Sequence, residues 1–286
     1  MNHTSPALVL GGGGSAGNAW LIGVLAGLLD GGLDVTGSDL IVGTSAGSTV
    51  AAQLAGERAP DLFAAILAAP TPPAAAARPL GDHLQRLARM VEASDDAADY
   101  RRRAGAAALE LPGSSDAATQ AHWRSTVGSR FSATDWPRAV AITAVDAHTG
   151  EPVVFTRDSG VTLVDAVAAS CAGSFAYRIG ARQYIDGGYR ANSDNADLAA
   201  GHDRVLVLSP LGGRSLHPVA WGTHLATQVE QLRATGSEVE TVVPDSASVA
   251  AFGDNMMDYS TRAPSAQAGF DQGRSLAAGL STFWRE

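Results

Sequence analysis

The sequence contains no lysine, a single cysteine and no long apolar run. All 20 basic residues are arginines, and 29 acidic residues bring the net charge to −9. Because no basic stripe is available to neutralise phosphates, nucleic acid is not expected as a partner. Docking on an anionic membrane by charge alone is disfavoured for the same reason. The lone Cys171 cannot form an internal disulfide, which fits a reducing compartment.

Targeting and membrane-spanning patterns are missing as well. The first residues lack the basic segment and the long apolar segment of a signal peptide. No window approaches the roughly eighteen continuous apolar residues that a spanning helix needs. We therefore expect a soluble, cytoplasmic protein.

Short apolar segments alternate with helical patterns along the 286 residues. Strands are expected at 7–10, 40–42, 139–145, 152–156, 183–185, 204–209 and 238–243, and helices at 18–30, 48–55, 60–69, 82–91, 163–171 and 219–233. This alternation predicts an α/β protein whose mostly parallel sheet is covered on both faces. We expect one domain over residues 1–286.

Residues 57–136 interrupt the alternation and are expected to form a helical insertion. It could serve as a lid over a substrate or as an ordinary helical hairpin on one side of the sheet. Within it, the Pro/Ala-rich residues 70–79 predict a break, and the charged residues 95–103 predict a solvated helix face. The tail from Ala251 is expected to be helical in patches.

The stretch around Ser45 carries the strongest catalytic signal. A short apolar strand leads into Gly43-Thr-Ser-Ala-Gly47, and a helix-compatible run of small residues follows. Strand, G-x-S-x-G and helix in this order describe a nucleophile elbow. Gly43 and Gly47 allow the strand and the helix to approach each other closely. The sequence therefore predicts Ser45 as a nucleophile, with a structural Gly/Ser turn as the alternative.

A second glycine-rich loop, Gly11 to Gly17, lies between the first strand and the first helix. Its backbone N–H groups could bind an anion. One interpretation is a dinucleotide site, because Gly12, Gly14 and Gly17 fit G-x-G-x-x-G. That site also needs an acidic residue at the end of the second strand, where this chain has the Ser45 turn. We therefore favour the other interpretation, an oxyanion hole that serves Ser45.

A serine hydroxyl needs a base within hydrogen-bond reach. Asp186 ends a predicted strand, and Gly187 and Gly188 after it allow a tight turn. A Ser-Asp-His triad would take its histidine from the set of His202, His217 and His224. Only one strand precedes the Ser45 turn and none of these histidines lies in a motif that presents it, so we favour Asp186 alone as the base. Cys171 is expected to be a small buried residue rather than a nucleophile.

In their order along the chain, the segments Leu8–Gly17, Gly43–Gly47 and Asp186–Gly188 resemble the three motifs of the patatin-like phospholipase family. The resemblance implies a three-layer α/β/α patatin-like fold and lipid acyl hydrolysis by a Ser-Asp dyad, without metal or cofactor. Ser45 then matches the nucleophile and Asp186 the base. Gly12, Gly13 and Gly14 match the oxyanion loop, with Gly13 and Gly14 as donors and Gly12 and Gly17 shaping it.

The loop departs from the family pattern at one position. The family often carries a basic residue just before the last loop glycine, where it can face a phosphate, and this chain has Ala16. We therefore expect neutral esters and glycerides to be preferred over phospholipids, with residues 62–67 contacting the acyl chain. Arg101 or Arg102 could replace the missing charge.

The expected partners are a lipid or acyl-ester substrate and, transiently, a membrane surface. A non-lipid carboxylesterase or thioesterase with the same dyad is the alternative among enzymes. A nucleotide-binding protein that uses the loop at 11–17 is the alternative from another class.

Overall fold

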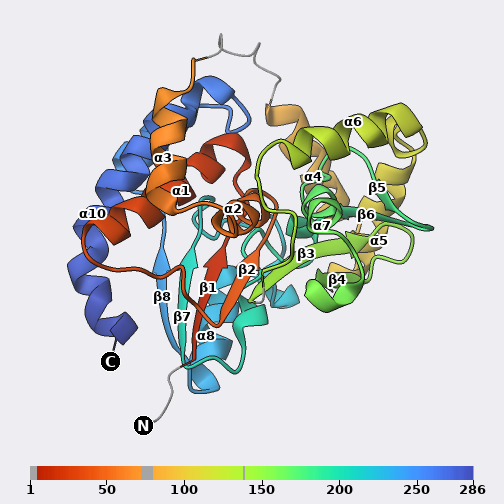
Figure 1. The fold of residues 1–286 in the computed structure, drawn as a ribbon. Helices are drawn as coiled ribbons and strands as arrows, with labels where there is room; N and C mark the ends of the chain where they lie inside the picture. Colours follow the sequence, from red (N-terminus) through yellow and green to blue (C-terminus); the bar gives the residue numbers. More distant parts are fainter. Residues whose placement is uncertain (1–4, 72–79, 138, 286) are drawn as a thin grey trace.

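The computed structural model describes residues 5–71, 80–137 and 139–285 (Figure 1). Its central feature is an eight-stranded sheet in the order β5-β6-β3-β2-β1-β7-β8, with β4 paired to β3. Strands β3, β2, β1, β7 and β8 run parallel, whereas β4 and β6 are antiparallel to β3, and β5 is antiparallel to β6. The strands are β1 (Pro6–Leu10), β2 (Leu40–Gly43), β3 (Val140–Asp146), β4 (Pro152–Phe155), β5 (Tyr177–Ile179), β6 (Arg182–Asp186), β7 (Arg204–Leu208) and β8 (Glu238–Val242). The expected mostly parallel α/β fold is confirmed.

Side chains of β1 alternate between two apolar cores. Leu8 and Leu10 are buried in the larger core, while Ala7 and Val9 are buried in the smaller one on the other face. Both faces are buried because parallel strands need crossover helices, which lie over the sheet. The strands accordingly read as continuous apolar runs rather than as alternating ones.

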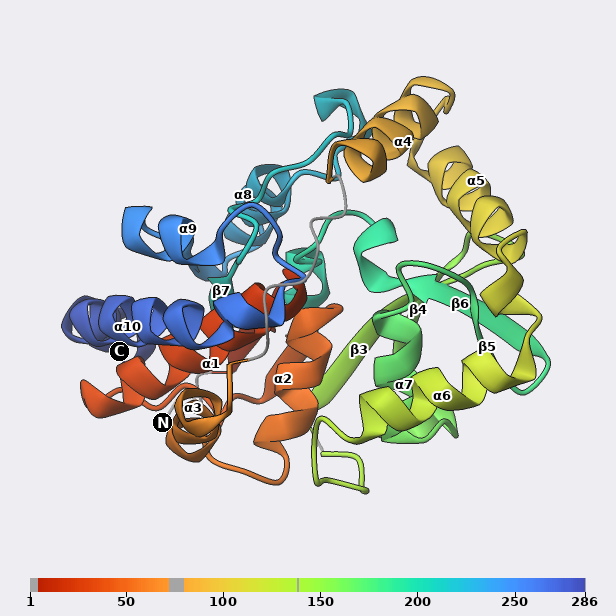
Figure 2. The same ribbon diagram turned by 90° about the horizontal axis from the view of Figure 1, so that it is seen from above.

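Helices cover the two faces unequally (Figures 1 and 2). Most of them pack in the larger core, and α8 covers the smaller one. The helices are α1 (Gly14–Asp30), α2 (Ala46–Leu54), α3 (Ala59–Ala68), α4 (Leu80–Glu92), α5 (Ala97–Leu109), α6 (Ala117–Gly128), α7 (Leu163–Ser170), α8 (Leu225–Ala234), α9 (Ser246–Phe252) and α10 (Arg262–Arg285). Within the described ranges, every helix is too short or too polar to cross a membrane.

Helices α1 and α10 approach each other through glycines. Gly23 and Gly27 of α1 face α10, and Gly269 and Gly273 of α10 face α1. A Cβ on any of the four would overlap a backbone carbonyl oxygen of the opposite helix. The glycines spaced four apart therefore permit backbone contact along the length of both helices. This packing fixes α10 beside the helix that begins at the glycine-rich loop.

The insertion consists of α3 to α6, which pack in different places. Leu62 and Ile66 of α3 are buried in the larger core, and Phe63 stacks on Phe270 of α10 at 4.8 Å between ring centroids. The expected acyl contact of residues 62–67 is thus wrong for the two buried side chains. Residues 72–79 of the expected break lie outside the described residues. A lid role for the insertion stays a prediction.

Several elements differ from the expected ones. The tail from Ala251 contains the end of α9, a 3-10 turn at Tyr259–Thr261 and the long helix α10, so the expected patches are present but one of them is long; β5 and α6 were not expected. The first helix begins at Gly14 instead of Asn18, because the glycine loop itself enters the helix. The expected helix at 219–233 is a short 3-10 turn, Val219–Trp221, followed by α8, because Gly222 adopts a left-handed conformation with φ 67°.

Candidate active site

The register of the sheet brings the two glycine motifs together. Leu10 at the end of β1 pairs with Gly43 at the end of β2, so the loops that follow leave the sheet side by side. A Cβ on Gly12 would lie 3.4 Å from the Cβ of Ser45. In the sheet, β1 lies between β2 and β7, so the strand order changes direction at β1. Open α/β sheets bind their ligands at such a switch point.

Ser45 lies at the sharp turn between β2 and α2. Its backbone has φ 51° and ψ −112°, and it is one of two non-glycine residues with positive φ in the described part of the chain. Close packing imposes this turn: a Cβ on Gly47 would overlap the Leu10 carbonyl, and one on Gly43 would lie 2.7 Å from the Ser48 Cα. A strained serine at a sharp turn between a strand and a helix is characteristic of a nucleophile elbow.

Hydrogen bonds to the backbone groups of Ser45 hold this turn in place. Its N–H donates to the Ser170 hydroxyl at 2.9 Å, and its carbonyl accepts from the Ser48 hydroxyl at 2.6 Å. The Cys171 thiol donates to the same carbonyl at 3.2 Å. Burial, followed by the charge of Asp186, raises the pKa of this thiol, so Cys171 is an inert neutral group rather than a nucleophile.

Asp186 ends β6 and faces Ser45. It pairs with Ala144 of β3, and a Cβ on the following Gly187 would overlap Thr143, so the turn lies tight against the sheet. Burial raises the pKa of Asp186 to about 6, and the hydrogen bond from the Gly188 N–H, at 2.8 Å, and the nearby Ser45 hydroxyl partly offset that shift. The structure thus brings Ser45 and Asp186 together, with the carboxylate made more basic by its surroundings.

The backbone amides of the glycine loop divide into engaged and open groups. Gly12 donates its N–H to the Ser193 carbonyl at 2.7 Å, and Gly17 donates to the Gly13 carbonyl at 2.9 Å. Gly13 and Gly14 begin α1, and among the described residues no group accepts their N–H protons. Gly12 therefore shapes the loop, and the candidate oxyanion donors reduce to Gly13 and Gly14 at the positive end of the helix.

The rings of the three histidines of the alternative triad hydrogen-bond to groups other than Ser45 and Asp186. The ring of His202 contacts the Ala199 carbonyl, and that of His224 contacts the His217 carbonyl at 2.7 Å. His217 is buried against Thr223, and burial lowers its pKa to about 4. In the described part of the chain, none of the three hydrogen-bonds to the candidate catalytic pair.

Arg101 and Arg102 do not supply a charge to the glycine loop. Arg101 donates to the carbonyls of Gly150 and Arg190, at 2.8 and 3.1 Å, and Arg102 pairs with Asp99 at 3.3 Å. The expectation that one of them replaces a basic residue at Ala16 is therefore not met.

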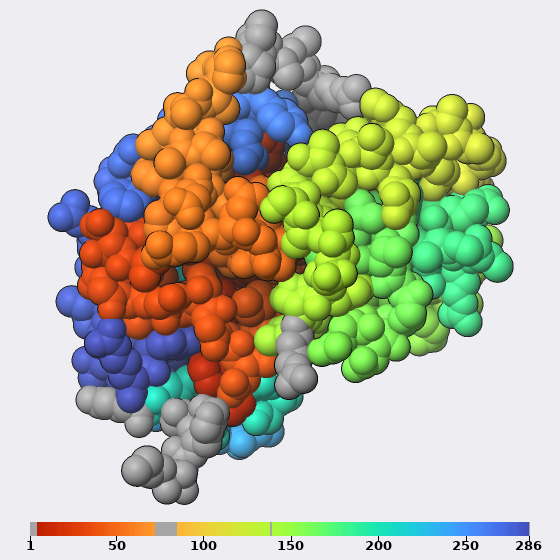
Figure 3. Space-filling model, in the orientation of Figure 1, coloured from red at the N-terminus to blue at the C-terminus, as the bar shows by residue number. Residues whose placement is uncertain are grey.

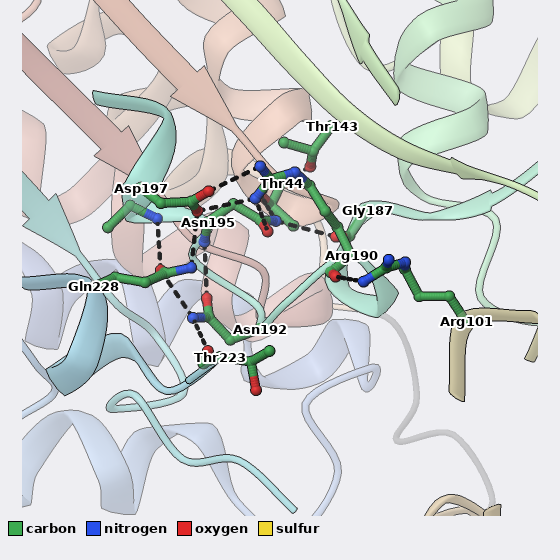
Figure 4. Close-up of polar contacts among 11 residues, drawn as sticks. Thr44, Arg101, Thr143, Gly187, Arg190, Asn192, Asn195, Asp197, Thr223 and Gln228 are labelled. Atoms are coloured by element: carbon green, nitrogen blue, oxygen red, sulfur yellow. Dashed lines mark hydrogen bonds and ion pairs between the residues drawn. The ribbon is translucent and has the colours of Figure 1, made fainter. Parts of the chain in front are cut away.

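A buried polar network contacts Thr44 and Gly187, the residues next to the candidate catalytic pair (Figure 4). Its centre is Asn195, which donates to Thr44 and to the carbonyl of Gly187, both at 3.0 Å. Arg190 donates to Asn195 and makes a bidentate contact with Asp197. The sequence interpretation did not include these residues. The polar run that follows Asp186-Gly-Gly, from 189 to 197, was the available signal.

Asp194 is a second buried carboxyl beside the loop. Neither of its oxygens has a hydrogen-bond partner of good geometry among the described residues, and a Cβ on Gly11 would overlap one of them. Burial raises the pKa of Asp194 to about 7, and the Ser209 hydroxyl offsets part of the shift. No three His, Cys, Asp or Glu side chains converge as a metal site would require, within the ranges that the structure describes.

Comparison with known proteins identifies the family of the chain. No curated protein matches the chain. The structure of VipD from Legionella pneumophila is 14% identical, with a TM-score of 0.45, over 98% of this chain and 67% of VipD. The type III effector protein ExoU is 17% identical, with a TM-score of 0.39; the match covers 99% of this chain but only 54% of ExoU, so the chain spans about half of its length. A family model described as patatin-like phospholipase matches residues 8–199, and the chain belongs to that family.

Proposed function

We propose that the protein is a serine lipid acyl hydrolase that cleaves carboxylic esters with Ser45 and Asp186. The observation that carries the proposal is the closeness of the two: a serine with a strained backbone has its hydroxyl beside a partly buried carboxylate whose pKa is raised to about 6. Family membership supports a lipid acyl substrate, such as a glyceride or a phospholipid. The nucleotide-binding alternative has no supporting observation in the fold or in the family match.

The reaction follows from the positions of these groups. Ser45 Oγ attacks the carbonyl carbon of the ester while its proton passes to Asp186. The tetrahedral oxyanion then accepts hydrogen bonds from the N–H groups of Gly13 and Gly14. Its collapse breaks the ester bond, and the departing alkoxide takes the proton from Asp186. Water, deprotonated by Asp186, attacks the acyl-serine; the bond from the acyl carbon to Ser45 Oγ breaks, Oγ takes the proton back from Asp186, and the carboxylic acid is released.

A carboxylate alone is a weak base for a serine hydroxyl, so other groups must lower the barrier. Raising the pKa of Asp186 brings it closer to the working pH, where a general base is most effective. Two preorganised N–H donors at the N-terminus of α1 stabilise the oxyanion, and loss of one such donor typically costs about 10²–10³ in rate. We therefore assign most of the rate enhancement to polarisation of the ester by these amides.

Labelling with a fluorophosphonate probe tests the nucleophile. The wild-type protein is expected to be labelled and to hydrolyse p-nitrophenyl esters, and Ser45→Ala is expected to lose both while keeping its circular dichroism spectrum and Tm. Ser125→Ala, at an exposed position of α6, is the matched control for labelling. A folded Ser45→Ala protein that keeps more than about a tenth of wild-type turnover contradicts the mechanism. A panel of thioesters, p-nitrophenyl esters and glycerides separates the lipid hydrolase from a general esterase or thioesterase.

A further inference from the structure

The segment that joins α9 to α10 contacts the first turn of α1 (Figure 2). The carbonyl of Met256 accepts the N–H of Ala16 at 2.9 Å, and Arg262 donates from Nη1 to the carbonyl of Ser15 at 3.2 Å. Both contacts come from residues beyond 199, where the match to the family model ends. The C-terminal part of the chain therefore forms part of the surroundings of the proposed oxyanion donors.

Within this segment, Met257 brings a thioether sulfur to Gly14. A Cβ on Gly14 would lie 2.8 Å from the Sδ of Met257, so the sulfur packs directly against the Cα of this glycine. The backbone of Met257 is held in place because its N–H donates to the Oδ1 of Asn255 at 3.0 Å. Met257 is nevertheless 62% exposed, and the α9–α10 region, blue in the space-filling view, lies at the surface beside the α3 region (Figure 3). A reagent in the solvent can therefore reach a sulfur that contacts the oxyanion loop.

The other sulfur atoms in the described ranges are better protected from solvent. Met256 is partly buried against the larger core, and Met90 is partly buried against a separate apolar cluster. Burial raises the pKa of the Cys171 thiol, and a thiol that stays protonated is a poor target for oxidants because the thiolate is the reactive form. An oxidant that enters from the solvent therefore meets Met257 first.

We propose that Met257 is an oxidation site for hydroperoxides and that its sulfoxide blocks the oxyanion donor Gly14. The proposal rests on the proposed function and adds a regulation of the same site. The Sδ lone pair of Met257 attacks the terminal oxygen of the hydroperoxide, the O–O bond breaks and an S–O bond forms. The proton of the terminal hydroxyl passes to the departing oxygen, so an alcohol is released, or water when the oxidant is hydrogen peroxide. The sulfur loses two electrons to the peroxide and becomes a sulfoxide.

The sulfoxide changes what this side chain offers to the glycine loop. A thioether sulfur is a weak hydrogen-bond acceptor, whereas a sulfoxide carries a polar oxygen. The N-terminus of α1 attracts this oxygen because that end of the helix is partially positive, and the N–H of Gly14 has no acceptor among the described residues. Once bound there, the oxygen competes with the carbonyl oxygen of the ester. Loss of one oxyanion donor typically costs about 10²–10³ in rate, so oxidation of Met257 is expected to inactivate the enzyme.

Treatment of the purified protein with hydrogen peroxide tests the proposal. Peptide mass spectrometry is expected to find sulfoxide at Met257 before any other methionine, and hydrolysis of a p-nitrophenyl ester should fall about tenfold or more once Met257 is fully oxidised. Met257→Leu has an apolar side chain of similar size that peroxide does not oxidise, so it should keep about half or more of its own untreated activity. Met90→Leu is the matched control and should be inactivated like the wild type. Methionine sulfoxide reductase should restore the oxidised wild-type protein.

Two further measurements do not depend on the oxidant or on turnover. Met257→Gln places an amide oxygen where the sulfoxide oxygen would lie, and its kcat/KM is expected to be about tenfold or more below that of Met257→Leu. Hydrogen exchange of the Gly14 amide, followed by NMR, should slow about tenfold when the wild-type protein is oxidised, because this N–H gains an acceptor.

Three results would overturn the proposal: full activity of a protein with Met257 fully oxidised, equal inactivation of the wild type and Met257→Leu, or unchanged exchange at Gly14 after oxidation. Failure of the proposed function looks different. An untreated protein that resists fluorophosphonate labelling, but whose Gly14 exchange still slows when Met257 is oxidised, would contradict the hydrolase and leave the oxidation site in place.

Discussion

Asn195 donates from Nδ2 to the hydroxyl of Thr44 at 3.0 Å, and Thr44 directly precedes Ser45. The same Nδ2 donates to the carbonyl of Gly187, the residue after Asp186. One fully buried amide therefore ties the nucleophile turn to the base turn across the end of the sheet (Figure 4). Arg190, held by Asp197 through contacts of 2.9 and 2.8 Å, fixes the amide by donating to its Oδ1.

Replacing Asn195 by Asp should lower kcat with little effect on KM. The change keeps the shape of the side chain but removes both donated hydrogen bonds, which lets the Ser45 and Asp186 turns move apart. A misplacement of about 1 Å between reacting groups can cost about 10²-fold in rate. Steady-state kinetics with a p-nitrophenyl ester measure the effect. Because φ at Asn195 is 56°, Asn195→Gly is the second variant, which removes the amide without backbone strain. Wild-type kcat in both folded variants would contradict the positioning role.

Asp186→Asn should be nearly as damaging as Ser45→Ala, because an amide cannot accept the serine proton. Replacing His202, His217 or His224 one at a time by Gln should leave kcat/KM within a few-fold, since all three are bound at other positions. Turnover of a p-nitrophenyl ester by each purified variant decides the matter. If one histidine proves as essential as Ser45, a triad replaces the dyad.

The pH profile should report the raised pKa of Asp186. The base must be ionised to accept a proton, so kcat/KM should rise with pH and level off above about 6, rather than near 4 as for an ordinary carboxyl. The measurement uses a neutral p-nitrophenyl ester between pH 4 and 9. A histidine base would give a similar midpoint, so the profile is repeated in the three histidine variants, where it should persist. A midpoint near 4 would show that burial does not shift this carboxyl.

Asp194 should make the protein less stable as the pH rises. Its pKa is about 7 in the folded state and 3.8 as the ordinary value, so the folded state holds the proton more tightly. The stability from this group is therefore fully present below about pH 4 and is lost as the pH rises through about 7. Asp194→Asn stays neutral at every pH, and its Tm relative to wild type should be higher at pH 8 than at pH 5. A Tm difference that does not change with pH would contradict an unpartnered buried carboxyl.

The parts of the site that the sequence predicted are those encoded locally. The turn at Ser45 needs only its own strand, two glycines and the following helix, and all of these lie within a dozen residues. The interaction of Asn195 with Thr44 joins residues 151 positions apart, and that of Arg262 with Ser15 joins residues 247 apart. Neither pattern carries a local signal, because the contact depends on how the sheet and α10 are packed.

The elements of the fold likewise divide into those predicted from local sequence and those that were not. Central strands were predicted within one or two residues because continuous apolar runs mark strands that are buried on both faces. Helix α6 was missed because its apolar residues do not form one stripe: Val127 alone is fully buried, while Trp123 is partly buried and donates to the Ala168 carbonyl. The length of helix α10 was not predicted because its buried face consists mostly of glycine, alanine and polar residues, which show no hydrophobic period.

The small-residue face of α10 predicts that Gly→Ala substitutions at two glycines change the free energy of unfolding in opposite directions. Gly→Ala in a helix normally adds about 0.5–1 kcal/mol of stability, because glycine loses more conformational freedom on folding. Gly279→Ala should show this gain, since nothing lies within 4 Å of its Cβ position. Gly27→Ala should instead destabilise by about 1–3 kcal/mol, because the new methyl group overlaps the Phe270 carbonyl oxygen and forces α1 and α10 apart. Urea denaturation of both variants gives the two free energies of unfolding. A stabilising Gly27→Ala would mean that α1 and α10 do not pack backbone to backbone in solution, and Arg262 would then lose the support that places it beside Ser15.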